Sequence, residues 1–297
     1  MDIYVLDLNF QDTPNAIAAY LVVGPSGPAL VETGPASTLS VLEARLAEHG
    51  YTTADIRDVL VTHIHLDHAG AAGWWARRGA RVYVHHVGAR HLIDPSRLLT
   101  SAERIYGDAM DRLWGKTLPA PEEQVHPLRD GDTIEVCGLR FIALDTPGHA
   151  KHHVVYQLGD VAFTGDVGAV RLQQSQFISL PAPPPEYDRE VWQTTLMRLR
   201  GIDLTTIYPT HYGPVSDVDL HFQALSELID QATEFVHVRM QAGMGRDALA
   251  KEYLAWARDR AAAHGVSAKE SQALDLANPT LMSVDGITRY WRKKGDS

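Results

Sequence analysis

Four potential metal ligands stand within six residues in the stretch Val61-Thr62-His63-Ile64-His65-Leu66-Asp67-His68-Ala69-Gly70. The run that leads into it, Asp58-Val59-Leu60-Val61, is typical of a buried strand. Imidazole and carboxylate groups at the end of such a strand must be satisfied by partners or water, so packing alone does not explain their density here. We therefore interpret the stretch as half of a metal site.

Three other stretches offer the remaining ligands, and each ends a strand-like apolar run. They are Thr146-Pro147-Gly148-His149, Thr164-Gly165-Asp166 and Pro209-Thr210-His211. Imidazole and carboxylate without thiolate suit zinc, manganese, iron or cobalt rather than a cysteine-rich structural zinc site. Imidazoles at i and i+2 can point at one ion, while Asp67 and His68 face a second position close by. The pattern therefore predicts two adjacent ions, with a carboxylate such as Asp166 suited to bridge them.

The composition is that of an ordinary globular protein, with 297 residues, 45% hydrophobic and 22% charged. A net charge of -10 argues against nucleic acid as the main partner, because nucleic-acid affinity depends on clustered Lys and Arg. The single cysteine, Cys137, excludes an internal disulfide and is expected to be a small buried hydrophobe. With no basic start followed by an apolar core and no apolar window long enough for a membrane span, we expect a cytoplasmic protein without a membrane partner.

The first part of the chain predicts a sheet interrupted by helices. Strand-like runs cover residues 3–8, 16–23, 29–32, 57–62 and 80–85, and the first three are expected to be antiparallel. Helices are expected over residues 39–48 and 71–78, with Ser37-Thr38 as the N-cap of the former. Residues 86–124 predict an inserted helical lid, with a helix packed on the sheet as the alternative.

Two hairpins are expected next, from strands at residues 133–136, 139–144, 154–158 and 161–164. Residues 168–187 are rich in proline and predict a stiff loop without regular structure. Asp188 is expected to cap a helix to about Arg200, and residues 204–208 to form a last buried strand. Beyond it, residues 217–241, 246–264 and 279–293 all predict helices.

With these motifs in order, the chain resembles the metallo-β-lactamase-fold hydrolase superfamily, which carries a His-x-His-x-Asp-His signature. The resemblance covers about residues 1 to 215 and implies an α/β fold, a four-layer αβ/βα sandwich of two facing mixed sheets with the site on loops at one edge. It implies a catalytic domain over residues 1–215, containing the lid at 86–124, and a helical C-terminal extension over 216–297 packed on the core. Carried over by position, the first metal would be held by His63, His65 and His149, and the second by Asp67, His68 and His211, with Asp166 as the bridge.

The resemblance and the ligands together predict a metal-dependent hydrolase that attacks a small-molecule ester, lactone or thioester through a metal-bridging hydroxide. Two divalent ions are expected, zinc first, with manganese, iron or cobalt as alternatives. Asp67 is expected to orient the hydroxide and pass a proton to the leaving group, or to serve only as a ligand. Tyr212 is a candidate hydrogen-bond donor to the oxyanion, with ordinary packing as the alternative.

The neighbourhood of His149 points to a glyoxalase II-like or lactonase-like branch. A second histidine of that form stands at His153, although His152 replaces the usual glycine. Thiolate-bearing relatives carry Cys where Asp166 stands, and flavin-linked diiron relatives carry Glu in place of His65. A phosphodiesterase of the same fold, a diiron redox protein and a non-catalytic metal-binding protein remain alternatives. Four apolar residues could line an acyl pocket, namely Ile105, Met110, Trp114 and Phe177, and the C-terminal helices could mediate a homodimer or cover the sheet.

Overall fold

The structure is a computed structural model that describes residues 1–172 and 175–295. Gln173 and Gln174, which belong to the loop predicted over residues 168–187, lie outside the described residues. The chain divides into two compact units. The first unit comprises Met1–Asp145 with His152–Thr164, and the second comprises Thr146–Lys151 with Gly165–Ser297. The domain boundary at residue 215 and the lid stay predictions.

The first unit contains a six-stranded sheet in the order β1-β2-β3-β4-β5-β6. Its strands are β1 (Asp2–Asp7), β2 (Ala18–Gly24), β3 (Gly27–Val31), β4 (Asp58–Leu60), β5 (Arg81–His85) and β6 (Val125–Leu128). The first three pair antiparallel, as predicted, and the later neighbours pair parallel. Parallel neighbours need crossover connections, and here these include α1 (Leu39–Glu48) and α3 (Ala72–Ala76).

The second sheet of this unit confirms the two predicted hairpins. It consists of β7 (Thr133–Val136), β8 (Leu139–Asp145), β9 (Val154–Leu158) and β10 (Val161–Phe163), all paired antiparallel. Cys137 and Gly138 form the turn between β7 and β8 with φ of 47° and 77°, the left-handed conformation that two-residue hairpin turns require. Burial raises the pKa of the Cys137 thiol to about 11, so the cysteine is an inert part of this turn.

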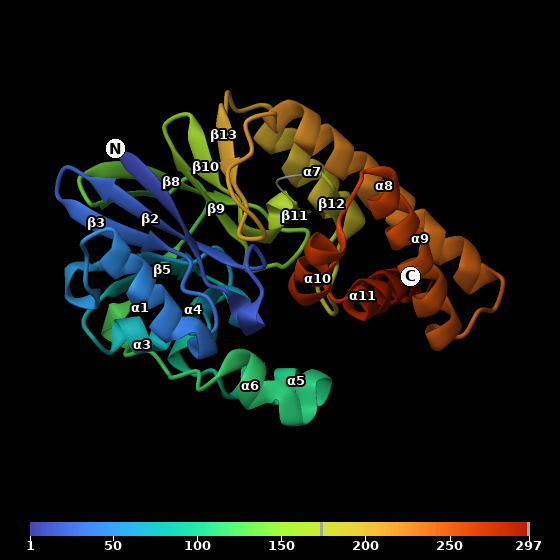
Figure 1. The fold of residues 1–297 in the computed structure, drawn as a ribbon, viewed down its shortest axis with the longest axis horizontal. Helices are drawn as coiled ribbons and strands as arrows, with labels where there is room; N and C mark the ends of the chain where they lie inside the picture. The colour runs from blue at the N-terminus through green and yellow to red at the C-terminus, as the bar shows by residue number, and fades with distance from the viewer. Residues whose placement is uncertain (173–174, 296–297) are drawn as a thin grey trace. The chain divides into compact units, whose positions relative to one another are not determined.

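The two sheets of the first unit pack face to face through aromatic side chains. The rings of Tyr20 and Phe163 lie 5.5 Å apart, and those of Phe141 and Phe163 6.4 Å apart. The buried Tyr156 hydroxyl lies 3.1 Å from the carbonyl oxygen of Val61 and 3.0 Å from that of Tyr83. Strands β8–β10 therefore lie over one face of the six-stranded sheet, while α1 and α3 cover the other (Figure 1). Tyr156 thereby fixes the backbone just before the histidine stretch.

Helix α1 begins where the sequence predicts, but the cap differs. Thr38 is the N-cap residue, yet its hydroxyl donates to the Pro35 carbonyl at 3.0 Å and makes no bond to the helix. Further along, the predicted helical segment forms α4 (Ala89–Ile93), α5 (Ser96–Tyr106) and α6 (Met110–Trp114). Trp114 is buried against Phe10 and Tyr106, whereas Ile105 is 49% exposed.

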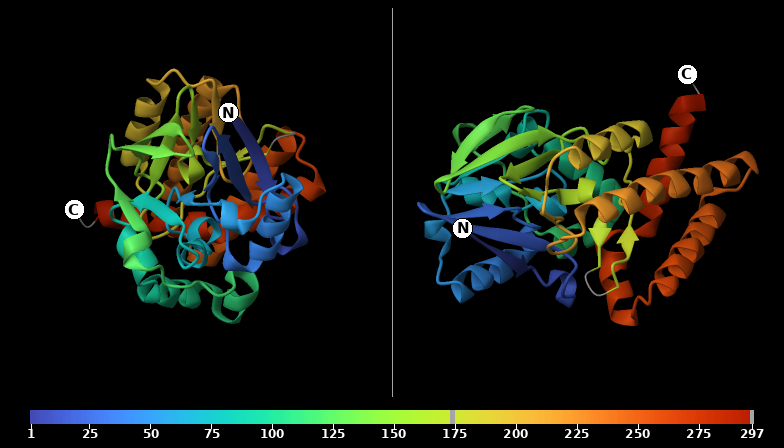
Figure 2. Two further views of the ribbon diagram at one scale, coloured as in Figure 1. Left: turned by 90° about the vertical axis from the view of Figure 1, so that its left-hand side faces the viewer. Right: turned by 90° about the horizontal axis from the view of Figure 1, so that it is seen from above.

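The second unit consists mainly of helices. They are α7 (Arg189–Arg200), α8 (Val218–Gln241), α9 (Arg246–Ala263), α10 (Ala268–Ala277) and α11 (Thr280–Gly295). Asp188 caps α7 as predicted, because its side chain accepts from the Val191 amide at 3.1 Å. Helix α10 was not predicted, although Ser267 and Glu270 form a capping box at its start. Helices α8, α9 and α11 contact one another, and α8 and α9 diverge from the turn that joins them (Figure 2).

Three short strands complete this unit, β11 (Val170–Arg171), β12 (Ile178–Ser179) and the predicted β13 (Thr206–Tyr208). The expectation of no regular structure over residues 168–187 was wrong, since β11 and β12 pair antiparallel there. The prolines that motivated it begin only at residue 181, after β12 has ended. Among the described residues, no helix has the length and apolar character needed to cross a membrane.

Candidate metal centre

In the first unit, the residues after β4 place four ligands on one loop and on the short helix α2 (Leu66–Ala69). His63 and His68 are fully buried, while His65 and Asp67 are partly exposed. His63 Nε2 lies 2.9 Å from His65 Nδ1, and His68 Nε2 lies 3.7 Å from Asp67 Oδ2. Ligand atoms of His63 and His68 also lie within 4.8 Å of each other. The structure thus gathers the four predicted residues of this stretch into one cluster.

A buried carboxylate, Glu32, lies behind this cluster. Glu32 is 1% exposed, follows β3, and accepts from His68 Nδ1 at 3.1 Å and from the Thr62 hydroxyl. The Thr62 oxygen lies 3.1 Å from His63 Nδ1. Because a carboxylate only accepts, the Thr62 hydrogen points to Glu32 and its oxygen accepts from His63. Both imidazoles therefore carry their proton on Nδ1, which leaves Nε2 as the atom that can bind an ion.

Sequence reasoning missed Glu32, which it treated only as the end of a strand. The available signal was the same one that located the other ligands, a carboxylate directly after an apolar strand.

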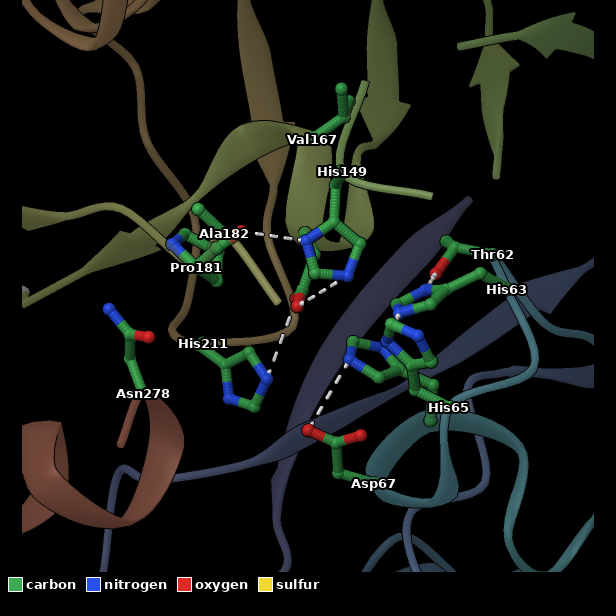
Figure 3. Close-up of polar contacts among 12 residues, drawn as sticks. Thr62, His63, His65, Asp67, His149, Val167, Pro181, Ala182, His211 and Asn278 are labelled. Carbon is green, nitrogen blue, oxygen red and sulfur yellow. Dashed lines mark hydrogen bonds and ion pairs between the residues drawn. The ribbon is translucent and has the colours of Figure 1, made fainter. Parts of the chain in front are cut away.

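In the second unit, His149, Asp166 and His211 converge. All three are buried, with exposed fractions of 1%, 4% and 1%. Asp166, in the turn Gly165–Gly168, directs Oδ2 at His149 Nε2 over 3.4 Å and Oδ1 at His211 Nε2 over 3.5 Å. His149 Nδ1 donates to the Pro181 carbonyl at 2.8 Å, and Figure 3 shows this bond behind the ring. The three predicted ligands of this unit are thus brought together around one carboxylate.

These separations fit divalent ions better than direct hydrogen bonds. Ligands about 2.1 Å from a tetrahedral ion lie roughly 3.4 Å from each other. The 3.4, 3.5 and 3.7 Å separations are close to this value and exceed an ordinary hydrogen bond. The 2.9 Å between His63 and His65 is shorter, so these two rings must separate slightly to share an ion. Asp166 offers one oxygen to each of two imidazoles, those of His149 and His211.

Two further histidines lie beside the first cluster. The ring of the buried His153 stacks 5.0 Å from that of His63, and the ring of His152 lies 5.5 Å from that of His65. The structure therefore places His153 where a supporting role for His63 is feasible. Tyr212 is 6% exposed, and its part in catalysis stays a prediction.

A buried polar network in the second unit links the backbone at two of the ligands. The Arg171 amide donates to the His211 carbonyl at 2.6 Å, and its guanidinium donates to His221 Nδ1 at 2.9 Å and to Asp217 at 3.0 Å. His221 Nε2 donates to the Gly168 carbonyl at 2.8 Å, in the turn that contains Asp166. Burial lowers the pKa of His221 to about 4, so this histidine is neutral at pH 7. Sequence reasoning did not identify this network.

Buried histidine and aspartate clusters at strand ends in an α/β protein are typical of a metal-binding site. The chain belongs to the metallo-beta-lactamase superfamily, whose family model matches residues 12–211. Superfamily members are metal-dependent hydrolases, and the clustered side chains could hold metal ions. This membership confirms the predicted fold class, and helices α8 to α11 confirm the predicted helical region after it.

Individual proteins of known sequence or structure are also similar to this chain. A metallo-beta-lactamase fold-containing protein of Sulfurisphaera tokodaii is 24% identical over 68% of this chain and 75% of its own. A hydroxyacylglutathione hydrolase of a Methylobacterium species is 30% identical over 60% of this chain and 58% of its own length. The crystal structure of a metallo-beta-lactamase family protein from Thermus thermophilus superposes with a TM-score of 0.73 at 24% identity, over 99% of this chain and 94% of that one. This last likeness shows that the fold extends through the C-terminal helices.

Proposed function

We propose that the chain is a dinuclear-metal hydrolase of a small-molecule ester, lactone or thioester. In this proposal the two clusters form one centre, with His63, His65 and His149 on one ion, Asp67, His68 and His211 on the other, and Asp166 between them. The observation that carries it is Asp166, whose two oxygens each face a different imidazole at the separation of ligands on an ion. Buried hydrogen bonds to Glu32 and Pro181 support it, since ligand histidines normally donate their second nitrogen to such groups.

The side chains divide the work of hydrolysis between them. Two bound dications would lower the pKa of a water towards neutrality and so supply hydroxide at pH 7. Asp67, whose side chain is 21% exposed beside His68, orients that nucleophile and passes its proton to the leaving group. Tyr212 donates a hydrogen bond to the oxyanion that develops on the substrate carbonyl. Zinc is our first choice of metal because nitrogen and carboxylate ligands suit it.

The class of substrate bond that we propose rests on the similar proteins and on the net charge of the chain. Several hydroxyacylglutathione hydrolases among the similar proteins, which are 25% to 31% identical to this chain over the matched residues, support a thioester. The net charge of -10 weighs against a polyanionic substrate. A neutral or singly charged acyl compound is therefore the substrate class that we propose.

Metal analysis followed by a substrate panel tests this function. The panel is p-nitrophenyl acetate, a lactone, an acyl thioester and a phosphodiester, each assayed with the wild type and with Asp166→Ala. We expect two ions per wild-type chain and turnover of an acyl substrate, both reduced in Asp166→Ala. Asp247→Ala is the matched control, because the Asp247 side chain is 99% exposed on α9. Two bound ions with no turnover of any substrate would contradict the proposal, as would phosphodiester turnover alone.

A further inference from the structure

The C-terminal helices contact the segment that orients a metal ligand. Helices α10 and α11 lie beyond residues 12–211, which match the superfamily. We propose that these helices position the imidazole of His149 by fixing the peptide between Pro181 and Ala182. Asn278 and Ser283 are the positioning residues. The inference rests on the proposed function, because His149 acts there as a metal ligand.

A single peptide plane connects His149 to α11. Its carbonyl, that of Pro181, accepts from His149 Nδ1 at 2.8 Å. Its amide, that of Ala182, donates to the Ser283 hydroxyl oxygen at 3.3 Å. The peptide bond is planar, so the direction of the amide fixes the direction of the carbonyl. Ser283 therefore determines where the acceptor for His149 points.

The segment has few other ways to hold this peptide. Residues 181–185 read Pro-Ala-Pro-Pro-Pro, and proline has no amide hydrogen. Ala182 therefore supplies the single backbone donor of these five residues. Ala182 and Ser283 are both fully buried, so removing the Ser283 oxygen would take away the acceptor of this buried amide and lower the stability of the segment.

A second set of bonds holds the preceding carbonyl. The Asn278 side-chain amide donates to the Leu180 carbonyl at 2.9 Å and to the Ser179 hydroxyl at 2.7 Å. The Ser283 hydroxyl oxygen lies 2.9 Å from the same Leu180 carbonyl oxygen and 3.1 Å from Asn278 Oδ1, and its hydrogen points towards these two acceptors. Asn278, His149, Pro181 and Ala182 are labelled together in Figure 3. Two consecutive peptides are thus anchored to α11 and to the residue that follows α10.

Helix α11 also packs directly on the backbone of this segment. A Cβ atom added at Gly286 would lie 1.9 Å from the Ala182 carbonyl oxygen and 2.8 Å from the Pro183 carbonyl carbon. Only glycine permits this approach, and it is the reason that Ser283, one turn earlier, reaches Ala182. Because of this close packing, the position of α11 determines the position of the Pro181 carbonyl.

Zinc titration of the metal-free protein tests the inference, with Ser283→Ala and Asn278→Ala as the variants. The matched control is Tyr290→Phe, which removes a buried α11 hydroxyl that bonds to Glu190 and not to the 179–182 segment. Calorimetry gives the affinity of each ion, the visible spectrum of the cobalt-loaded protein reports ligand geometry, and the melting temperature of the metal-free protein reports stability.

We expect both variants to weaken one of the two zinc-binding steps about tenfold or more and to alter the cobalt spectrum. Tyr290→Phe should lower the melting temperature comparably while leaving both affinities and the spectrum unchanged. Wild-type affinities and spectrum in both variants would overturn the inference while leaving the proposed function intact. Equal loss in Tyr290→Phe would also overturn it, because general destabilisation would then be the cause. A wild type that binds no zinc would overturn the proposed function and this inference with it.

Discussion

Replacing Glu32 with glutamine is expected to weaken zinc binding 10- to 100-fold at one or both positions, the range for losing a hydrogen bond behind a metal ligand. One carboxylate oxygen, Oε1, accepts from both His68 Nδ1 and the Thr62 hydroxyl, and the other, Oε2, accepts from the Thr62 amide at 3.3 Å. Glutamine has the same shape but only one oxygen, so its amide nitrogen takes the place of one of these two oxygens. In the place of Oε1, the nitrogen cannot accept from His68 or from the Thr62 hydroxyl. In the place of Oε2, it faces the Thr62 amide, another donor, and in both cases the negative charge behind His68 is lost.

Either orientation therefore removes at least one hydrogen bond to the buried carboxylate, together with its charge behind the metal-binding histidine His68. Losing a buried hydrogen bond to a charged group should also lower the free energy of unfolding by about 1.5 to 3 kcal/mol. The assay is zinc calorimetry of the metal-free protein together with denaturant unfolding. Glu43→Gln, an exposed carboxylate on α1, is the control and should change neither. Wild-type affinity at both positions in Glu32→Gln would refute the reasoning.

Three other variants test separate parts of the structure. The pKa of His221 is lowered to about 4 by burial from an ordinary 6.5, so its neutral form stabilises the folded state above pH 6.5 and that stability is lost as the pH falls towards 4. Denaturant unfolding should show wild type losing roughly 3 kcal/mol relative to His221→Gln over that interval, and parallel curves would contradict this. Gly148→Ala should destabilise by about 2 to 5 kcal/mol in the same assay, because φ is 136° and a Cβ would lie 2.4 Å from Trp192 Cβ; an unchanged midpoint would be inconsistent with the packing. Tyr212→Phe should lower kcat about 100-fold with KM and melting temperature unchanged if the hydroxyl serves the oxyanion, and an unchanged kcat would assign it to packing.

The sequence could predict the ligands because each follows a strand, where local pattern and chemistry coincide. His63 and Asp166 are recognisable from a few neighbours, and the antiparallel strands and long helices follow from alternation and helical spacing. The site residues found this way form a cluster within each unit.

The contacts that orient those ligands could not be predicted in the same way. Glu32 follows an apolar strand as the ligands do, but it precedes His68 by 36 residues, and Ser283 follows the Pro181 region by about 100, so no local pattern shows which ligand each one supports. Their contacts depend on tertiary packing, including the close approach at Gly286. Short elements such as β11 and β12 were missed for a related reason, since two residues carry too little periodicity to be seen.

The most direct test of the account is the number of zinc ions bound per chain in the wild type and in Asp166→Ala, measured by elemental analysis after dialysis against metal-free buffer. A carboxylate that serves two ions predicts two per wild-type chain and one or none in the variant. One ion in both proteins, or two in both, would contradict a centre bridged by Asp166.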